Sequence, residues 1–120
     1  MNAVDMWEEL KKGDIVKIPL CHSDLVQAKV RPALVLYHDL KNTQLTVAYI
    51  TSKTDNLEPT DILITFGSPT CNATGLPKTS ALRVHWLAVV KRIHVIGKYG
   101  EADDVFHRQV NKVLPECLAI

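Results

Sequence analysis

The chain has 120 residues, of which 47% are apolar and 22% are charged, and its formal net charge is +1. This length and composition are typical of one globular domain with a real core. The small charge excludes a general attraction to nucleic acid, so a basic surface would have to arise from local placement. No apolar run approaches the ~20 residues of a membrane span. The acidic N-terminus lacks a signal-peptide pattern, and three scattered cysteines favour reduced thiols and a cytoplasmic protein.

The first half of the chain predicts a short helix and then strands. Asp5 and Glu8 form a capping-box pattern, so a helix should end near Lys12, before Gly13. A strand follows, with Val16 and Ile18 on one face, and then a polar loop over residues 22–29. Residues 33–37 form an apolar run typical of a strand buried on both faces. After a turn at residues 41–43, residues 44–51 alternate as a further strand does.

The second half predicts more strands and a closing helix. Residues 61–66 read as a strand, 67–78 as a loop rich in helix and strand breakers, and 79–99 as two or three strands. From Ala102 apolar residues recur at helical spacing, which indicates an amphipathic helix packed on the sheet, with Pro115 kinking or ending it. The residues of this apolar face are Val105, Phe106, Val110, Val113, Leu114 and Cys117. The fold class is therefore α+β: a small, strongly curved antiparallel sheet with helices at both ends of one domain, divided as 1–12, 13–100 and 101–120.

Two strand ends carry candidate catalytic groups. Arg31 precedes Pro32, and a residue before proline is kept out of the helical region, so its guanidinium should be held at the mouth of a strand. That arrangement suits a preorganised contact with an anion. Thr51 places a hydroxyl at the end of the strand over residues 44–51. Taken alone, the two residues are better interpreted as an ordinary surface arginine and an ordinary strand threonine.

Other polar residues near these strands are weaker candidates. His22 and His85 are candidates for proton transfer, because histidine is the residue type whose unperturbed pKa suits it, although a loop histidine is commonly just solvated. Lysines can line a phosphate groove or simply keep a surface soluble; those in question are Lys29, Lys53 and Lys78. Trp86 offers a face for a base or a contact in a core or interface. No second ligand follows Cys21 and His22 at zinc-binding spacing, so neither a metal site nor a cofactor is expected.

An ordered set of short motifs resembles one protein family. They are residues 13–16 (GDIV), 31–36 (RPALVL), 50–53 (ITSK), 76–83 (LPKTSALR) and 96–100 (IGKYG). In this order the chain resembles the MazF/PemK-like toxins of bacterial type II toxin–antitoxin systems, from Gly13 to Leu114. The resemblance implies an SH3-like barrel of the PemK/CcdB-like fold and a homodimer. It also implies metal-independent cleavage of single-stranded RNA, a cognate antitoxin, and catalytic roles for Arg31 and Thr51.

The residues also depart from the family pattern. The loop before Arg31 lacks the acidic Gly-Ser-Glu-Gln element of many members, and Lys53 replaces a common glutamine. These differences bear on the RNA sequence that would be preferred.

The implied chemistry is sensible for these side chains. Attack by a ribose 2′-hydroxyl requires a base, an acid and charge stabilisation on the phosphoryl oxygens. Arg31 suits the last role but is a poor base, so one of the histidines could assist it. The alternative is a gyrase-directed or catalytically silent binding protein of the same fold, which would not need both Arg31 and Thr51.

Overall fold

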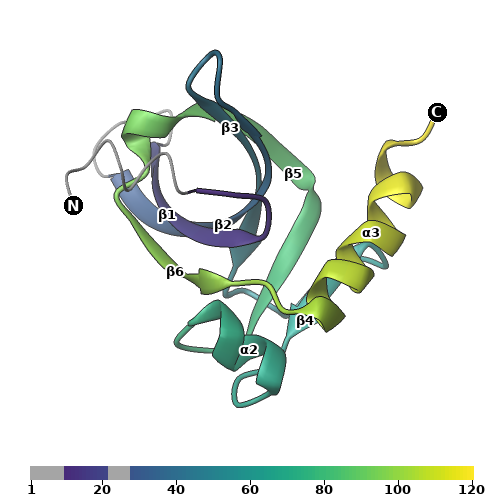
Figure 1. Cartoon of the computed structure of the whole chain (residues 1–120). Coiled ribbons are helices and arrows are strands. Elements are labelled where there is room, and N and C mark those ends of the chain that lie inside the picture. The colour runs from purple at the N-terminus through teal and green to yellow at the C-terminus, as the bar shows by residue number, and fades with distance from the viewer. Residues whose placement is uncertain (1–9, 22–27) are drawn as a thin grey trace.

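The computed structural model describes residues 10–21 and 28–120, and within them one six-stranded antiparallel sheet curls into a half-barrel (Figure 1). The strands lie in the order β4-β5-β3-β2-β1-β6. Their bounds are β1 Asp14–Cys21, β2 Ala28–Asp39, β3 Gln44–Thr51, β4 Asp61–Ile64, β5 Ser80–Lys91 and β6 Gly97–Glu101. The helices are α2 Pro69–Thr74, the 3-10 helix η1 Arg92–His94, and α3 Asp104–Leu118. None of the described helices has the length and apolar character needed to cross a membrane.

Both faces of the central strands are buried, as their sequences predict. Ala33 and Val35 of β2 pack in one apolar cluster, whereas Leu34 packs in the other. The same alternation holds along β3, where Leu45 and Val47 face one cluster and Ala48 and Ile50 face the other. The curled sheet therefore encloses one core on its concave side. A second core lies between the sheet and the helices α2 and α3. The predicted curved antiparallel sheet is confirmed.

A bulge in β2 sets the register of the β2–β3 hairpin. Asp39 pairs with Gln44 next to the turn, and Val35 pairs with Val47 further along. The pairing shifts by one residue between these points, and Leu36 is the β2 residue left without a β3 partner. Such a bulge bends its strand and exchanges the faces of all residues beyond it.

α3 packs one face on the sheet, as its apolar spacing predicts. Phe106 is fully buried and Val110 nearly so, while Val105 is half-exposed and does not belong to the packed face. Asp103 is the N-cap, and its carboxylate accepts a hydrogen bond from the Phe106 N–H at 2.9 Å. The prediction that Pro115 kinks or ends the helix is wrong for its end, because α3 continues to Leu118. Only the last turn lies beyond Pro115, and the Pro115 carbonyl accepts a hydrogen bond from the Ala119 N–H.

Residues 67–78 are not the continuous loop that their prolines and glycines suggest, because α2 occupies Pro69–Thr74. The Ser68 side chain accepts a hydrogen bond from the Cys71 N–H, and Pro69 takes the first helical position, where no N–H is needed. Gly75 ends the helix with a φ of 72°. An added Cβ there would lie 2.1 Å from the Tyr99 carbonyl oxygen, so α2 and β6 touch backbone to backbone.

One further prediction needs correction. The predicted N-terminal helix lies mostly outside the described residues, and its expected end is wrong, since Leu10 to Lys12 are not helical. Of the two or three strands expected over residues 79–99, the structure has two, β5 and β6, and η1 lies between them. Cys71 and Cys117 carry free thiols.

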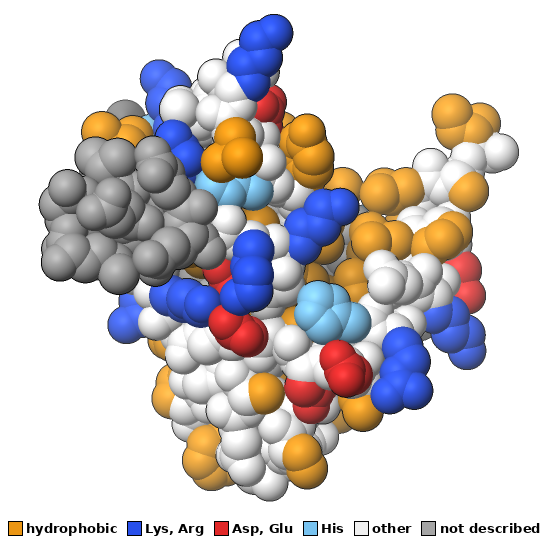
Figure 2. Space-filling model, in the orientation of Figure 1, with side chains coloured by type: hydrophobic (Ala, Val, Ile, Leu, Met, Phe, Trp, Pro, Cys, Tyr) orange, Lys and Arg blue, Asp and Glu red, His pale blue; other side chains and the backbone are white. Residues whose placement is uncertain are grey.

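Ion pairs close the edge where β1 meets β6. The Asp14 carboxylate is fully buried and lies 3.2 Å from Lys11 Nζ and 3.1 Å from Lys98 Nζ. Hydrogen bonds from Lys11 and Lys98 lower the pKa of Glu101 to about 2. Figure 2 shows one face of the molecule, with lysine and arginine side chains against carboxylates beside the sheet and apolar side chains along the flank of α3.

Candidate active site

Arg31 and Thr51 lie towards the same end of the β2–β3 hairpin. The β2–β3 pairing runs as far as Ala33 and Tyr49. Arg31 and Thr51 each lie two positions beyond this last pair, away from the turn, so the register of the hairpin brings them to the same level. Without the bulge at Leu36 the β3 residue at that level would be Ser52. The two candidate groups, twenty positions apart in sequence, thus come together at one end of a hairpin.

Both residues line one large hollow of about 590 Å³. Its charged and polar lining comes from Arg31, Thr51, Lys53 and His85. The rest of the lining is apolar or aromatic: Tyr49, Ile50, Trp86 and Leu87. No carboxylate belongs to this lining, within the part of the chain that the structure describes. The hollow therefore combines positive charge with an apolar floor, which suits an anionic ligand that carries flat apolar groups.

The Thr51 hydroxyl is oriented by the backbone. Its oxygen accepts a hydrogen bond from the Lys53 N–H at 3.1 Å. This leaves the hydroxyl proton free to be donated to a bound group. Lys53 itself is exposed at the rim. Burial raises the pKa of the neighbouring Tyr49 phenol above its ordinary value of 10.0, so this residue stays a neutral neighbour at physiological pH.

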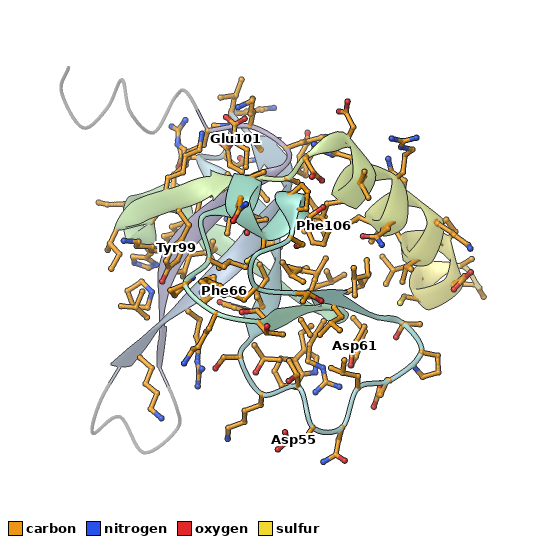
Figure 3. The ribbon with its side chains drawn as sticks, turned by 90° about the horizontal axis from the view of Figure 1, so that it is seen from below. Asp55, Asp61, Phe66, Tyr99, Glu101 and Phe106 are labelled. Atoms are coloured by element: carbon orange, nitrogen blue, oxygen red, sulfur yellow. The ribbon has the colours of Figure 1, made fainter. Side chains whose placement is uncertain are left out.

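A second, smaller hollow of about 170 Å³ lies on the other side of Arg31. Its polar lining includes Ser52, Lys78 and Ser80, and Tyr99 of β6 closes it. Arg31 is thus shared by two adjoining hollows, and an extended ligand lying over its guanidinium could enter both. Figure 3 shows Tyr99 at this side of the sheet, away from Phe106 beneath α3.

A break in the β5 ladder builds the wall of the large hollow. β5 pairs with β3 along residues 87–91 and again along 81–82, and residues 83–86 stand opposite Tyr49 alone. Extra residues of this kind re-aim side chains and are frequent beside active sites. Here they carry His85 and Trp86 into the hollow.

Only some of the other candidate residues line the two hollows. Lys53 and His85 join Arg31 and Thr51 in the large hollow, and Lys78 lies in the smaller one. Lys29 is exposed on β2 and lines neither hollow. His22 lies outside the described residues. Among those described, no three His, Cys, Asp or Glu side chains are grouped closely enough to hold a metal ion.

Arg83 is the functional neighbour that the sequence did not single out. Its guanidinium carbon lies 4.4 Å from the Trp86 ring centroid. Its Nε lies 3.4 Å from the buried carboxylate of Asp61, and its NH2 nitrogen lies 3.7 Å from Glu58. Glu58 also lies 3.6 Å from His85 Nε2. Figure 3 shows Asp61 within the molecule and Asp55 on the loop that precedes β4. The motif over residues 76–83 ends on Arg83, but it does not reveal the role of this residue, because the partners of Arg83 come from a loop and an edge strand.

Solved structures of similar fold are toxins and endoribonucleases. The MazE–MazF structure from Deinococcus radiodurans superposes with a TM-score of 0.71 at 17% identity, covering 92% of this chain and 96% of that one. An endoribonuclease in complex with its cognate antitoxin from a mycobacterial species gives 0.70 at 14% identity, with the same coverage of 92% and 96%. The Mycobacterium tuberculosis toxin MazF-mt6 gives 0.68 at 18% identity, covering 89% and 97%. At these identities the likeness concerns the fold.

No curated protein sequence shows significant similarity to the chain. The sequence profile of one family, however, matches residues 11–118, which include both hollows and both helices of the described structure. The chain belongs to the PemK-like, MazF-like toxins of type II toxin–antitoxin systems.

Proposed function

We propose that the protein is a toxin endoribonuclease that cleaves single-stranded RNA without a metal ion and is inhibited by a cognate antitoxin. The observation that carries the proposal is the shared hollow of Arg31 and Thr51. A guanidinium and a hydroxyl that come together at one end of a hairpin can bind the same phosphate from two sides. A gyrase-directed or silent binding protein of this fold would have no use for that pairing.

Arg31 is the group that stabilises charge in this proposal. Its planar donors match phosphoryl oxygens, and the guanidinium stays protonated throughout the reaction. Thr51 donates a hydrogen bond from its hydroxyl to the same phosphate, while its oxygen accepts one from the Lys53 N–H. As the ribose 2′-oxygen forms its bond to phosphorus and the bond to the 5′-oxygen breaks, negative charge grows on the oxygens that these two residues bind.

Proton transfer falls to a histidine. The 2′-hydroxyl gives up a proton on attack, and the departing 5′-oxygen takes one up, which leaves a 2′,3′-cyclic phosphate. His85 lines the hollow, and its Nε2 lies 3.6 Å from Glu58, which would orient the ring. His22 is the alternative from the loop before Arg31. General acid–base assistance of this kind contributes about 100- to 10,000-fold to a rate.

The test is cleavage of a mixed-sequence single-stranded RNA by the purified full chain in excess chelator. We expect products ending in cyclic phosphate, and a rate that falls roughly 100- to 1000-fold in Arg31→Ala. Thr51→Val should be impaired far more than Thr51→Ser, which keeps the hydroxyl. Arg108→Ala, on the exposed side of α3, is the matched control and should cleave normally. Equal activity of wild type and Arg31→Ala would refute the proposal.

The partners follow from the same hollow. We propose that an acidic antitoxin segment occupies it in the inhibited state, since its charged lining is basic and an acidic chain would complement it. We further propose a homodimer as the working form. Single-stranded RNA and the antitoxin should then compete for the free toxin. Simultaneous binding of both with unchanged affinities would contradict this arrangement.

A further inference from the structure

Trp86 is a large aromatic residue that the fold leaves at the surface. The indole is 47% exposed, so it is not a core residue. It lies in the β5 segment that leaves the β3 ladder, and it lines the same hollow as Arg31 and Thr51. The half-exposed indole therefore presents apolar surface to any ligand that enters this hollow.

The ring is held in place from one side. The Arg83 guanidinium lies over it at 4.4 Å, within the range of a cation–π contact. Arg83 is in turn fixed by Asp61, whose side chain has no exposure, and by Glu58. His85 packs edgewise against the indole, with ring centroids 6.3 Å apart and an interplanar angle of 74°. One face of the ring and one edge are therefore already used, and one flat face remains for a ligand.

We propose that Trp86 is a nucleobase-stacking subsite beside the phosphate contact at Arg31, with Arg83 as its positioning residue. The inference rests on the proposed RNA substrate and specifies how that substrate is gripped. An unpaired base can leave its neighbours and stack on an indole, whereas a base within a duplex cannot. The cationic lining holds the phosphate, and the apolar floor accepts the base. Trp86 thereby selects single strands over double strands and contributes affinity with little sequence preference.

The two tryptophans of the chain, Trp7 and Trp86, make the subsite directly observable. In a Trp7→Phe background the remaining fluorescence reports on Trp86 alone. The probe is a fluorescein-labelled single-stranded 2′-O-methyl RNA, which lacks the attacking hydroxyl and cannot be cleaved. We expect it to quench Trp86 fluorescence at the same concentration at which label anisotropy rises. The same sequence presented as a duplex should cause no quenching.

Variants measure the contribution. Loss of one stacked base typically weakens binding by roughly 5- to 150-fold. Trp86→Leu should show a loss in this range, and Trp86→Tyr should recover most of the affinity. Tyr37→Leu is the matched control, because Tyr37 is an aromatic residue of similar exposure, 53%, that lies outside both hollows. Its affinity should equal that of wild type.

The outcomes separate this inference from the proposed function. Unchanged RNA affinity in a folded Trp86→Leu variant would overturn the subsite, as would binding without quenching. A change in oligomeric state with unchanged RNA affinity would overturn it too, and would assign Trp86 to an interface. If Trp86 is quenched and required for binding but the wild type cleaves no RNA, the subsite stands and the endoribonuclease proposal fails. If cleavage depends on Arg31 but not on Trp86, the endoribonuclease proposal stands and the stacking subsite fails.

Discussion

Arg83→Met should destabilise the fold strongly, because it removes the cation beside a buried carboxylate. The Asp61 side chain has no exposure, and its Oδ1 lies 3.4 Å from Arg83 Nε. Asp61 Oδ2 accepts a hydrogen bond from the Glu58 N–H at 2.8 Å. Oδ1 and Arg83 Nε make no conventional hydrogen bond within the described residues, so these two atoms depend on each other for electrostatic compensation. Removing one partner of a buried ion pair costs about 3–5 kcal/mol. The contact is long and Arg83 is 18% exposed, so we expect a loss near the lower end, about 3 kcal/mol.

The effects of the two partners should be unequal. In Asp61→Asn the Arg83 guanidinium still contacts solvent and still lies 3.7 Å from Glu58. The free energy of unfolding should therefore fall by only about 1–2 kcal/mol. The double variant should lose at least about 1 kcal/mol less than the sum of the single losses. Urea denaturation of the four proteins measures this cycle, with the midpoint for Arg83→Met falling by roughly 1–3 M. Arg108→Met is a control expected to lie within about 0.5 kcal/mol of wild type.

Two results would refute the reasoning. If Arg83→Met loses less than about 1 kcal/mol, the Asp61 carboxylate must be stabilised by something other than the guanidinium. Strictly additive losses in the double variant would show that the two side chains do not interact energetically, whatever their separation. Either result would also weaken the account of how the Trp86 ring is held.

Three further expectations concern the core, a close contact and pH. Phe106→Ala, which empties a fully buried site, should lower the free energy of unfolding by about 3–5 kcal/mol in urea. Gly75→Ala should cost more than Gly67→Ala: both have positive φ, but only Gly75 meets backbone atoms, and equal melting temperatures would contradict this. The pKa of Glu101 is lowered to about 2 in the fold from an ordinary value of 4.5. Its stabilisation is therefore complete above pH 4.5 and lost as the pH falls towards 2, so Glu101→Gln should flatten acid unfolding curves in that interval.

Much of the fold could be predicted because apolar spacing reports burial directly. The alternation over residues 44–51 predicts β3 with its observed bounds, and the spacing of Phe106 and Val110 predicts α3. The prediction fails where one residue type has two structural roles. Pro69 and Gly75 break helices in their interiors but also begin and end them, and α2 uses them in the second way. Pro115 lies so close to the end of α3 that the turn beyond it persists.

The candidate site could be predicted only in part. Thr51 ends its strand as predicted, whereas Arg31 lies inside β2 and not at its mouth, so the choice of Arg31 rests on the family resemblance. The wall formed by residues 83–86 could not be predicted, because it depends on how β5 divides its pairing. Leu82 pairs with Ile50 of β3 and with Ile62 of β4, and this shared position is a property of the assembled sheet. Arg83 acquires its partners only through that assembly.

The single extra residue at Leu36 shifts the pairing register of the hairpin by one position. It lies five positions from Arg31, yet it decides that Thr51 and not the adjacent Ser52 comes to the same level of the hairpin as Arg31. The register is held by buried neighbours such as Leu34 and Val47, which line neither hollow. Side chains that border the hollows can therefore be replaced without changing the relative position of the two candidate groups.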